Sequence, residues 1–316
     1  MTTQEEGSLE KWPRDCGRFQ LLSRLGRGGN AEVFRARMVQ GMLAGEEVAL
    51  KRVRPERARD PEAREQLLHE AELARCLSHP HIVGFREYGE QADGPYLALE
   101  LVEGTDLGRV LAQCRRRRIE LPIDISVMMV RHVLEALAHA HAATNAKGRP
   151  LAVVHCDVSP HNVLLSRGGE VKLADFGVAR SRAGMAVDWR RMGKQHYRSP
   201  ELLAGEVSVA VDLWAAAVLL YELLSLESPF EGSTEEEVEA SIRGVRVTPV
   251  RMLAPEVSDP LALVLDRALA PHPAQRFSSA EQFARALAAL SDDRVATPLA
   301  VAAVVRGLMG AEPVSG

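Results

Sequence analysis

The chain has 316 residues, of which 46% are apolar and 26% charged, a balance that excludes a fibrous or largely disordered protein. Its 39 basic and 43 acidic side chains give a net charge of −4, so no excess of positive charge points to nucleic acid or an anionic membrane as a partner. No apolar run reaches the roughly 20 residues of a membrane helix, and the polar N-terminus lacks a secretory segment. Four scattered cysteines without a CxxC pair suit a reducing compartment. We therefore expect a cytoplasmic protein.

The first third of the chain has the pattern of a β-sheet. After a polar leader at residues 1–18, apolar and polar residues alternate, which is typical of half-buried strands. One helical segment, residues 61–77, interrupts this pattern. Five strands are predicted, at residues 19–25, 32–38, 47–53, 82–89 and 96–101.

The rest of the chain has mainly helical periodicity. A β half followed by an α half predicts an α+β protein of two lobes with a crevice between them. We expect one domain at 19–290, with an N-lobe at 19–101 and a C-lobe at 105–290, and then a tail at 291–316 with a short helix at 299–309. The C-lobe helices are predicted at residues 107–116, 123–141, 209–226, 234–243, 260–269 and 280–290.

A glycine-rich segment, LGRGGNAEVF at residues 25–34, lies between the first two predicted strands. Glycines at positions 26, 28 and 29 would let backbone N–H groups approach a phosphate closely. An ordinary tight turn would give the same pattern. A dinucleotide-binding fingerprint is disfavoured, because a strand and not a helix follows.

Two charged residues follow in positions suited to a nucleotide. In VALK, strand alternation places Ala49 and Lys51 on one face. A lysine on a solvent-exposed strand face would give the same pattern. Glu70 falls on the apolar stripe of helix 61–77, where a carboxylate is costly unless it is paired. Lys51 is its natural partner, and the alternative is a glutamate that reaches past the rim to water.

Two later segments supply acids and an amide. In VHCDVSPHNVLL, Asp157 and Asn162 lie in a polar loop between apolar flanks, and VKLADFG places Asp175 after a short strand. Together these residues can provide one general base and two oxygen ligands for Mg²⁺.

This ordered set, with SPE at residues 199–201, resembles the eukaryotic-like (Hanks-type) protein kinases from residue 19 to about residue 290. The sequences of these two loops are most similar to those of bacterial serine/threonine kinases. The resemblance implies a two-lobed fold with a five-stranded antiparallel sheet and one helix in the N-lobe and a mainly helical C-lobe. It also implies ATP and Mg²⁺ as cofactors and a protein as substrate.

The resemblance assigns a role to each matching residue. Asp157 would be the base, Lys51 would hold phosphates with help from Glu70, and Asn162 and Asp175 would bind Mg²⁺. Asp212 would cap backbone N–H groups of the catalytic loop, and Glu201 would form a buried pair with Arg276. ATP would contact Leu25, Gly26, Gly28, Gly29, Val33, Ala49, Lys51, Leu99, Glu100 and Val102.

The chain departs from the family pattern in the catalytic loop. Cys156 replaces the arginine that receives an activating phosphate, and residues 175–201 contain no threonine. We therefore expect activity that does not depend on phosphorylation of this segment, although Ser181 could still serve as a switch. Ala31 replaces the third glycine of the family's loop, and this position tolerates small residues.

A second departure affects charge near the transferred phosphate. Ser159 stands where the family has a lysine, and Lys194 stands where it has a threonine. We expect that the cation has moved from the catalytic loop to the facing segment, which makes both positions catalytic candidates. The alternative is a solvated lysine and a tolerated serine.

The expected function is transfer of the ATP γ-phosphoryl group to serine or threonine of another protein. A pseudokinase, which binds nucleotide with little turnover, is the alternative, and a kinase of small metabolites fits less well because of the SPE motif. The basic run at 115–118 suits a solvated helix end better than a docking site for acidic substrates. The apolar tail could pack on the C-lobe, on a second copy or on a regulatory partner.

Overall fold

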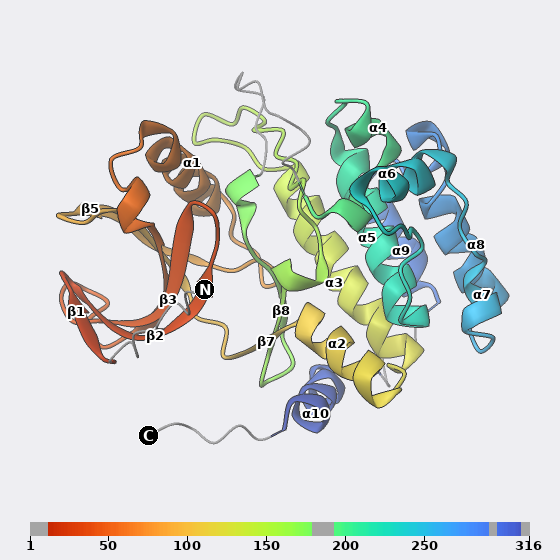
Figure 1. Ribbon diagram of the computed structural model, residues 1–316, viewed down its shortest axis with the longest axis horizontal. Coiled ribbons are helices and arrows are strands. Elements are labelled where there is room, and N and C mark those ends of the chain that lie inside the picture. The colour runs from red at the N-terminus through yellow and green to blue at the C-terminus, as the bar shows by residue number, and fades with distance from the viewer. Residues whose placement is uncertain (1–11, 179–192, 291–295, 311–316) are drawn as a thin grey trace, which may run out of the picture. The chain divides into compact units, whose positions relative to one another are not determined.

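The computed structural model describes residues 12–178, 193–290 and 296–310 (Figure 1). The chain divides into two compact units. The first consists of residues 1–75 and 84–101, and the second of residues 76–83 and 102–316.

The first unit is built on an antiparallel sheet of six strands, one more than predicted. The extra strand lies in the predicted leader, where three residues pair with the start of the next strand. Alternation could not reveal it, because a three-residue strand is too short to show a period. In spatial order the strands are β1 (Arg14–Cys16), β2 (Phe19–Arg27), β3 (Ala31–Met38), β4 (Glu47–Val53), β6 (Gly94–Glu100) and β5 (Phe85–Gln91).

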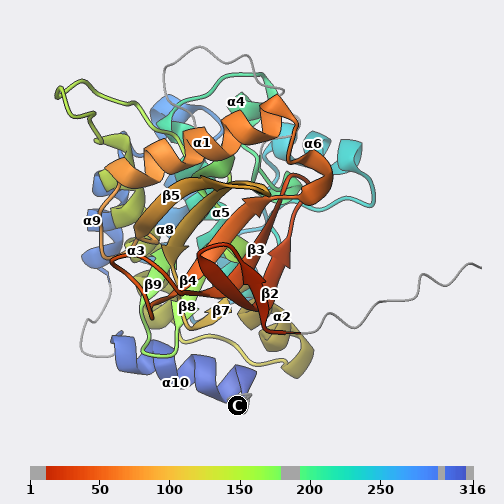
Figure 2. The same cartoon turned by 90° about the vertical axis from the view of Figure 1, so that its left-hand side faces the viewer.

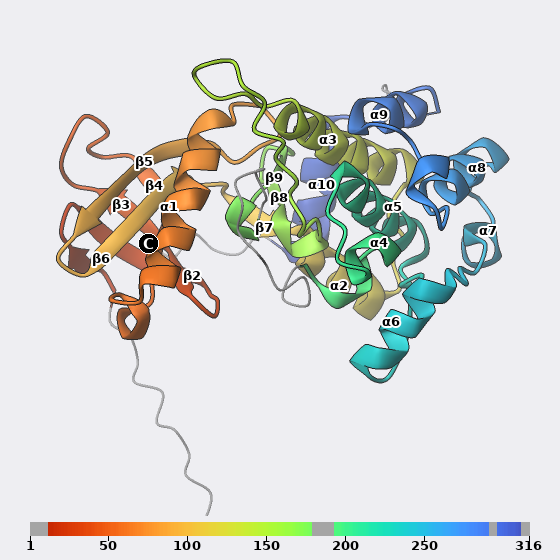
Figure 3. The ribbon, with the colours of Figure 1, turned by 90° about the horizontal axis from the view of Figure 1, so that it is seen from above.

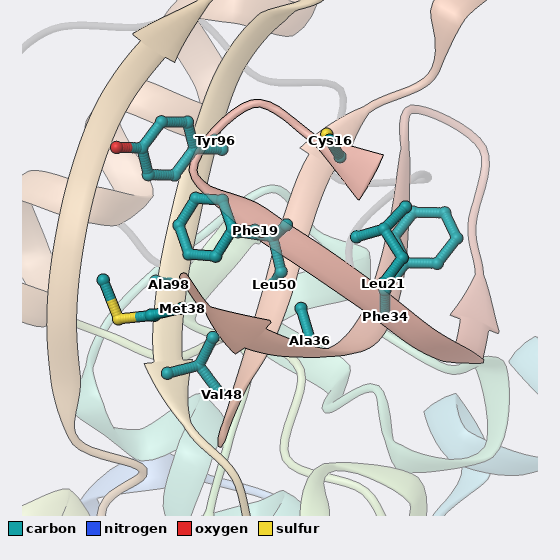
Figure 4. Close-up of a cluster of buried hydrophobic side chains, with 10 residues drawn as sticks. All are labelled: Cys16, Phe19, Leu21, Phe34, Ala36, Met38, Val48, Leu50, Tyr96 and Ala98. Carbon is teal, nitrogen blue, oxygen red and sulfur yellow. The ribbon is translucent and has the colours of Figure 1, made fainter. Parts of the chain in front are cut away.

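One face of this sheet carries a compact apolar core (Figure 4). Strand alternation directs every second side chain to this face, and Phe19 and Tyr96 meet there edge to face with ring centroids 5.0 Å apart. Trp12, before β1, packs against the same cluster. The buried members are Cys16, Phe19, Leu21, Phe34, Ala36, Met38, Val48, Leu50, Tyr96 and Ala98.

Helix α1 (Pro61–Cys76) lies across the opposite face of the sheet (Figure 2). Its apolar stripe, which includes Leu67 and Ala71, packs with Val53 and Leu97 from the sheet. The periodicity that predicted this helix therefore also identified its buried side.

The second unit is mainly helical, as predicted. Helices α3, α5 and α9 pack against one another (Figure 3). A three-stranded sheet of β7 (Gly104–Asp106), β8 (Val163–Ser166) and β9 (Val171–Leu173) also belongs to this unit. None of the described helices is long and apolar enough to cross a lipid bilayer. The helices are α2 (Leu107–Arg117), α3 (Ile123–His141), α4 (Pro200–Leu203), α5 (Val209–Ser225), α6 (Glu235–Gly244), α7 (Val250–Leu253), α8 (Asp259–Ala268), α9 (Ala280–Ala288) and α10 (Pro298–Met309).

Helix α10 of the tail packs on the C-lobe, the first of the three alternatives given for the tail. It packs on α2 and β8 of its own unit (Figure 1), and its buried side chains include Val301 and Val305. Arg117 donates a hydrogen bond of 2.9 Å to the carbonyl of Gly307. The apolar side of this helix is therefore covered by the C-lobe.

Candidate active site

The glycine-rich segment forms the turn between β2 and β3. The N–H of Gly28 donates to the carbonyl of Ala31 at 2.8 Å, which closes the turn, while the glycines at 26, 28 and 29 are exposed. Ala31 pairs with Val53 in the regular register of β3 and β4. An alanine at the position of the family's third glycine is therefore accommodated in the strand.

An asparagine that the sequence did not single out anchors this turn. Asn30 donates from Nδ2 to Oε1 of Gln66 at 2.7 Å, and its Oδ1 accepts from Arg57. Asparagine in a turn is too common to be a signal by itself. The contact ties the turn to α1, which also carries Glu70.

Lys51 and Glu70 form the predicted ion pair. The Lys51 ammonium lies 2.7 Å from Oε1 and 2.8 Å from Oε2 of Glu70, and the two side chains are only 15% and 5% exposed. Partial burial limits screening by water, so this pair holds the ammonium in one place more firmly than a surface pair would.

The residues predicted to face adenine share the Lys51 face of the sheet. Val33 is directly opposite Lys51, and Leu99 is directly opposite Ala49. Directly paired residues project to the same side of a sheet. Leu25 is 46% exposed at the end of β2, and Val102 belongs to the second unit.

Glu100 plays a structural part at the end of β6. Its N–H donates to the carbonyl of Gly84 at 2.7 Å, and its carboxylate accepts from the N–H of Gly84 at 2.9 Å. The carboxylate of Glu100 is therefore used in a contact within the chain. Pairing of Glu100 with the adenine base of ATP would involve its backbone carbonyl.

Asp212 anchors the catalytic loop as predicted. The fully buried carboxylate, near the start of α5, accepts hydrogen bonds of 2.8 Å from the N–H groups of His155 and Cys156. Nε2 of His141 lies 2.8 Å from the same carboxylate, a partner that the sequence analysis missed. Cys156 adopts a left-handed backbone with φ of 64°, which these bonds to a charged acceptor help to hold.

Asp157 follows directly and is held by Asn162. Nδ2 of Asn162 donates to the carboxylate and to the carbonyl of Asp157, each at 2.8 Å. Burial raises the pKa of Asp157, and the nearby charge of Asp175 raises it further, while His155, the Asn162 hydrogen bond and Lys194 lower it. The site thus makes this carboxyl more basic than an ordinary aspartate.

The donor set fits a magnesium ion. Asn162 uses its amide N–H groups on Asp157, which leaves its carbonyl oxygen to bind a cation. Asp175 has a left-handed backbone with φ of 64° and accepts a 3.2 Å hydrogen bond from the N–H of Gly177. The Coulomb repulsion between Asp157 and Asp175 would be relieved by a cation, and oxygen ligands are those that Mg²⁺ prefers.

The segment around residue 194 lies against the catalytic loop. A Cβ at Gly193 would lie 2.8 Å from the carbonyl oxygen of Cys156 and 3.9 Å from the Asp157 carboxylate. Burial lowers the pKa of Lys194, while the charge of Asp157 raises it. Ser159 is wholly buried, and its Oγ has no hydrogen-bond partner in the part of the chain that the structure describes. Ser181 lies outside the described residues.

The predicted pair of Glu201 and Arg276 is confirmed. The guanidinium donates to both carboxylate oxygens at 2.6 and 2.9 Å, with the side chains 0% and 5% exposed. The same guanidinium stacks over the ring of Trp214 at 4.5 Å from its centroid. This pair fixes α4, which directly follows the segment of Lys194.

Within the basic run at 115–118, Arg115 makes contacts inside the C-lobe. Arg115 binds the carboxylate of Glu222 at 2.5 Å and the carbonyl of Leu226 at 2.7 Å. It lines a cavity of about 700 Å³ whose other charged walls include Glu227, Glu231 and Glu237. Four glutamates against one arginine do not suit an acidic peptide, so the docking alternative is disfavoured.

Comparison with known proteins identifies the family of this chain. Residues 19–287 match the family described as the protein kinase domain. The chain is 33% identical over 286 residues to the tyrosine-protein kinase MasK of Myxococcus xanthus, covering 89% of this chain and 44% of that protein. It is 33% identical over 317 residues to a probable serine/threonine-protein kinase of Streptomyces coelicolor, covering 96% and 45%. It is 29% identical over 271 residues to the serine/threonine-protein kinase PrkC of Bacillus subtilis, covering 85% and 40%.

The sheet-and-helix fold and these paired charges are those of a protein kinase domain. The chain belongs to the protein kinase domain family, with relatives among bacterial Hanks-type kinases, so the family and the fold class predicted from the sequence are confirmed. The chain spans less than half the length of these curated relatives.

Proposed function

We propose that this protein transfers the γ-phosphoryl group of ATP to serine or threonine hydroxyls of other proteins. The observation that carries the proposal is the Asp157–Asn162 pair, in which a carboxylate of raised pKa is held by an amide beside a second acid, Asp175. A base of raised pKa and oxygen donors for a metal are the groups that phosphoryl transfer needs in addition to phosphate positioning.

Each residue has a distinct task in this reaction. Lys51, held by Glu70, binds the α- and β-phosphates, and the backbone N–H groups of residues 26–31 cover them. Asn162 and Asp175 hold Mg²⁺, which neutralises phosphate charge when bound. Asp157 orients the acceptor hydroxyl and takes its proton as the hydroxyl oxygen attacks the γ-phosphorus, while the bond from this phosphorus to the bridging oxygen breaks and ADP leaves.

We extend the proposal to Lys194 as the cation that replaces the family's catalytic-loop lysine. Its charge lowers the pKa of Asp157, which supports a position beside the reacting groups. Ser159 is buried and uncharged, so it supplies no charge to the transferred phosphate. The stabilising charge then comes from the opposite side of the acceptor site.

The activation segment also suggests constitutive activity. Position 156, where an arginine would receive a phosphate, holds a buried cysteine whose Sγ lies 3.6 Å from the carbonyl of Val154. With no cationic side chain there, a phosphate on the segment has no receptor at this position. Phosphatase-treated protein should therefore keep its rate, and a large loss would contradict this part of the proposal.

The test is a transfer assay with purified full chain, radiolabelled ATP, Mg²⁺ and acceptor peptides that differ only in carrying serine, threonine or tyrosine. Label on the serine and threonine peptides supports the proposal. Label on the tyrosine peptide alone would reassign the acceptor class, a relevant outcome because one relative is named a tyrosine-protein kinase. ATP binding without any transfer would identify a pseudokinase.

We also propose a cytoplasmic location. The described cysteines are free thiols, which supports a reducing compartment.

A further inference from the structure

Two histidines and a glutamate of the second unit form a cluster outside the kinase machinery. His81 lies in the connection between α1 and β5, and His132 and Glu135 lie three residues apart on α3. One ligand atom from each of the three lies within 4.8 Å of the others. Residues three apart on a helix face the same side, so α3 presents an imidazole and a carboxylate together to His81.

His81 is oriented as a metal ligand would be. Its Nδ1 lies 2.9 Å from the carbonyl oxygen of Val171, an atom that can only accept, so Nδ1 carries the proton. Nε2 then presents its lone pair, and it lies 3.6 Å from Oε2 of Glu135. Proteins usually fix a metal-binding histidine by a hydrogen bond from its other ring N–H to a carbonyl or carboxylate oxygen. Val171 is buried in β9, so this support is rigid.

The other two members complete a half-open site. The rings of His81 and His132 stack face to face, 3.8 Å between centroids and 13° between planes. Because the lone pair of a ring nitrogen lies in the plane of its ring, the two imidazoles bind one ion only when His132 turns out of this stack, while the hydrogen bond to Val171 holds His81. The side chain of His81 is 19% exposed and that of Glu135 is 40% exposed, so water can reach a bound ion. Glu135 also lies 3.7 Å from the Nε of Arg131, a long contact that a metal ion would replace.

We infer that His81, His132 and Glu135 bind a zinc ion, with water as the fourth ligand. Two imidazoles and one carboxylate form a donor set that suits Zn²⁺. Mg²⁺ and Ca²⁺ prefer oxygen ligands alone. The bound ion would join the α1–β5 connection to α3 within the second unit, and this function is independent of phosphoryl transfer.

Two further histidines lie beside the cluster. His79 stacks on His139 at 5.2 Å between centroids and lies 5.6 Å from the ring of His81.

The experiment titrates zinc into the full chain, stripped of metal, in thiol-free and nucleotide-free buffer, by calorimetry. We expect one zinc per chain in the wild type and an affinity at least ~10-fold weaker in His132→Ala and in Glu135→Gln. The surface substitution His272→Ala is the matched control and should bind as the wild type does. Glu135→Gln keeps the shape of the side chain, so a loss of binding there is not a loss of folding. Circular dichroism of each metal-free variant checks this.

Cobalt(II) in place of zinc reports the ligands. A visible ligand-field spectrum without a thiolate charge-transfer band supports histidine and carboxylate ligation, and its loss in His132→Ala assigns it to this cluster. Equal zinc binding in the wild type and in both cluster variants would overturn the inference. So would absence of binding in the wild type, or a thiolate band, which would place the metal on cysteine.

Discussion

Lys194 lies close enough to Asp157 for the charge of each residue to shift the pKa of the other. The lysine lowers the pKa of the carboxyl, which burial raises, and the carboxylate raises the pKa of the ammonium, which burial lowers. Two residues 37 positions apart in the sequence thus form one electrostatic unit, and the pH dependence of turnover should report it.

We predict an acid limb of the rate profile above the pKa of an ordinary aspartate, because Asp157 must be deprotonated to act as a base and its pKa is raised. In Lys194→Met this limb should move to still higher pH, because the cation that lowers the pKa of Asp157 is gone. Turnover against pH for the wild type and the variant checks both statements. A limb that stays in place or moves to lower pH would contradict the pairing.

The alkaline side of the same profile offers a second prediction. Because burial lowers the pKa of Lys194, its charge should be lost below the usual lysine range near 10.5, and turnover should fall as it is lost. The exchange variant Ser159→Lys with Lys194→Thr should restore a cation at the other position and keep turnover. An inactive exchange variant that still binds ATP, or a harmless Lys194→Ala, would exclude a catalytic role for this lysine.

The Lys51–Glu70 pair is tested by two glutamates on the same helix. Glu70→Gln removes a buried charge partner of Lys51, and a hydrogen bond to a charged group contributes about 1.5–3 kcal/mol. We expect kcat/KM for ATP to fall by at least ~10-fold. Glu72→Gln, an exposed position two residues further along α1, is the control and should leave it unchanged. Equal kinetics for the two variants would mean that the pair is only structural.

The Glu201–Arg276 pair should govern stability. Arg276→Met leaves a buried carboxylate without its partner, and we expect a loss of about 3–5 kcal/mol in the free energy of unfolding. Adding Glu201→Leu should recover part of this loss, because the uncompensated charge disappears. Urea denaturation of the full chain measures both variants. Additive losses in the double variant would show that the two side chains do not interact energetically.

The docking of α10 is tested by a pair of glycines. Gly169 and Gly148 both have positive φ, 89° and 71°. A Cβ at Gly169 would lie 1.7 Å from the carbonyl oxygen of Pro298 at the start of α10, whereas a Cβ at Gly148 would meet nothing within 4 Å. Gly169→Ala should therefore release α10 to proteolysis near residue 298, and Gly148→Ala should share only the backbone strain. Equal protection of α10 in both variants would contradict the packing.

Local pattern and charge were sufficient to predict much of the site. Glu70 was found because a carboxylate on an apolar helical stripe needs a partner, and Lys51 was the cation whose strand position suited it. The Asp212 and Arg276 contacts followed from family resemblance, since nothing local specifies the partner of a buried acid 57 or 75 residues away.

What the sequence did not reveal depends on non-local contacts. Strand β5 begins at Phe85 and not at residue 82, because Ile82 forms a bridge with Leu173 far along the chain. The Asn30–Gln66 anchor and the His81–His132–Glu135 cluster join common residues from separate elements. Only the folded chain brings such residues together, so no window of sequence contains their signal.

The most direct test of the central claim compares the wild type with Asp157→Asn for both ATP affinity and turnover. The substitution keeps the size of the side chain but removes the proton acceptor, so we predict nearly unchanged ATP binding and a turnover lower by about 10²–10⁴-fold. Equal phosphoryl transfer in the two proteins would show that Asp157 is not the base, and the proposed mechanism would be wrong.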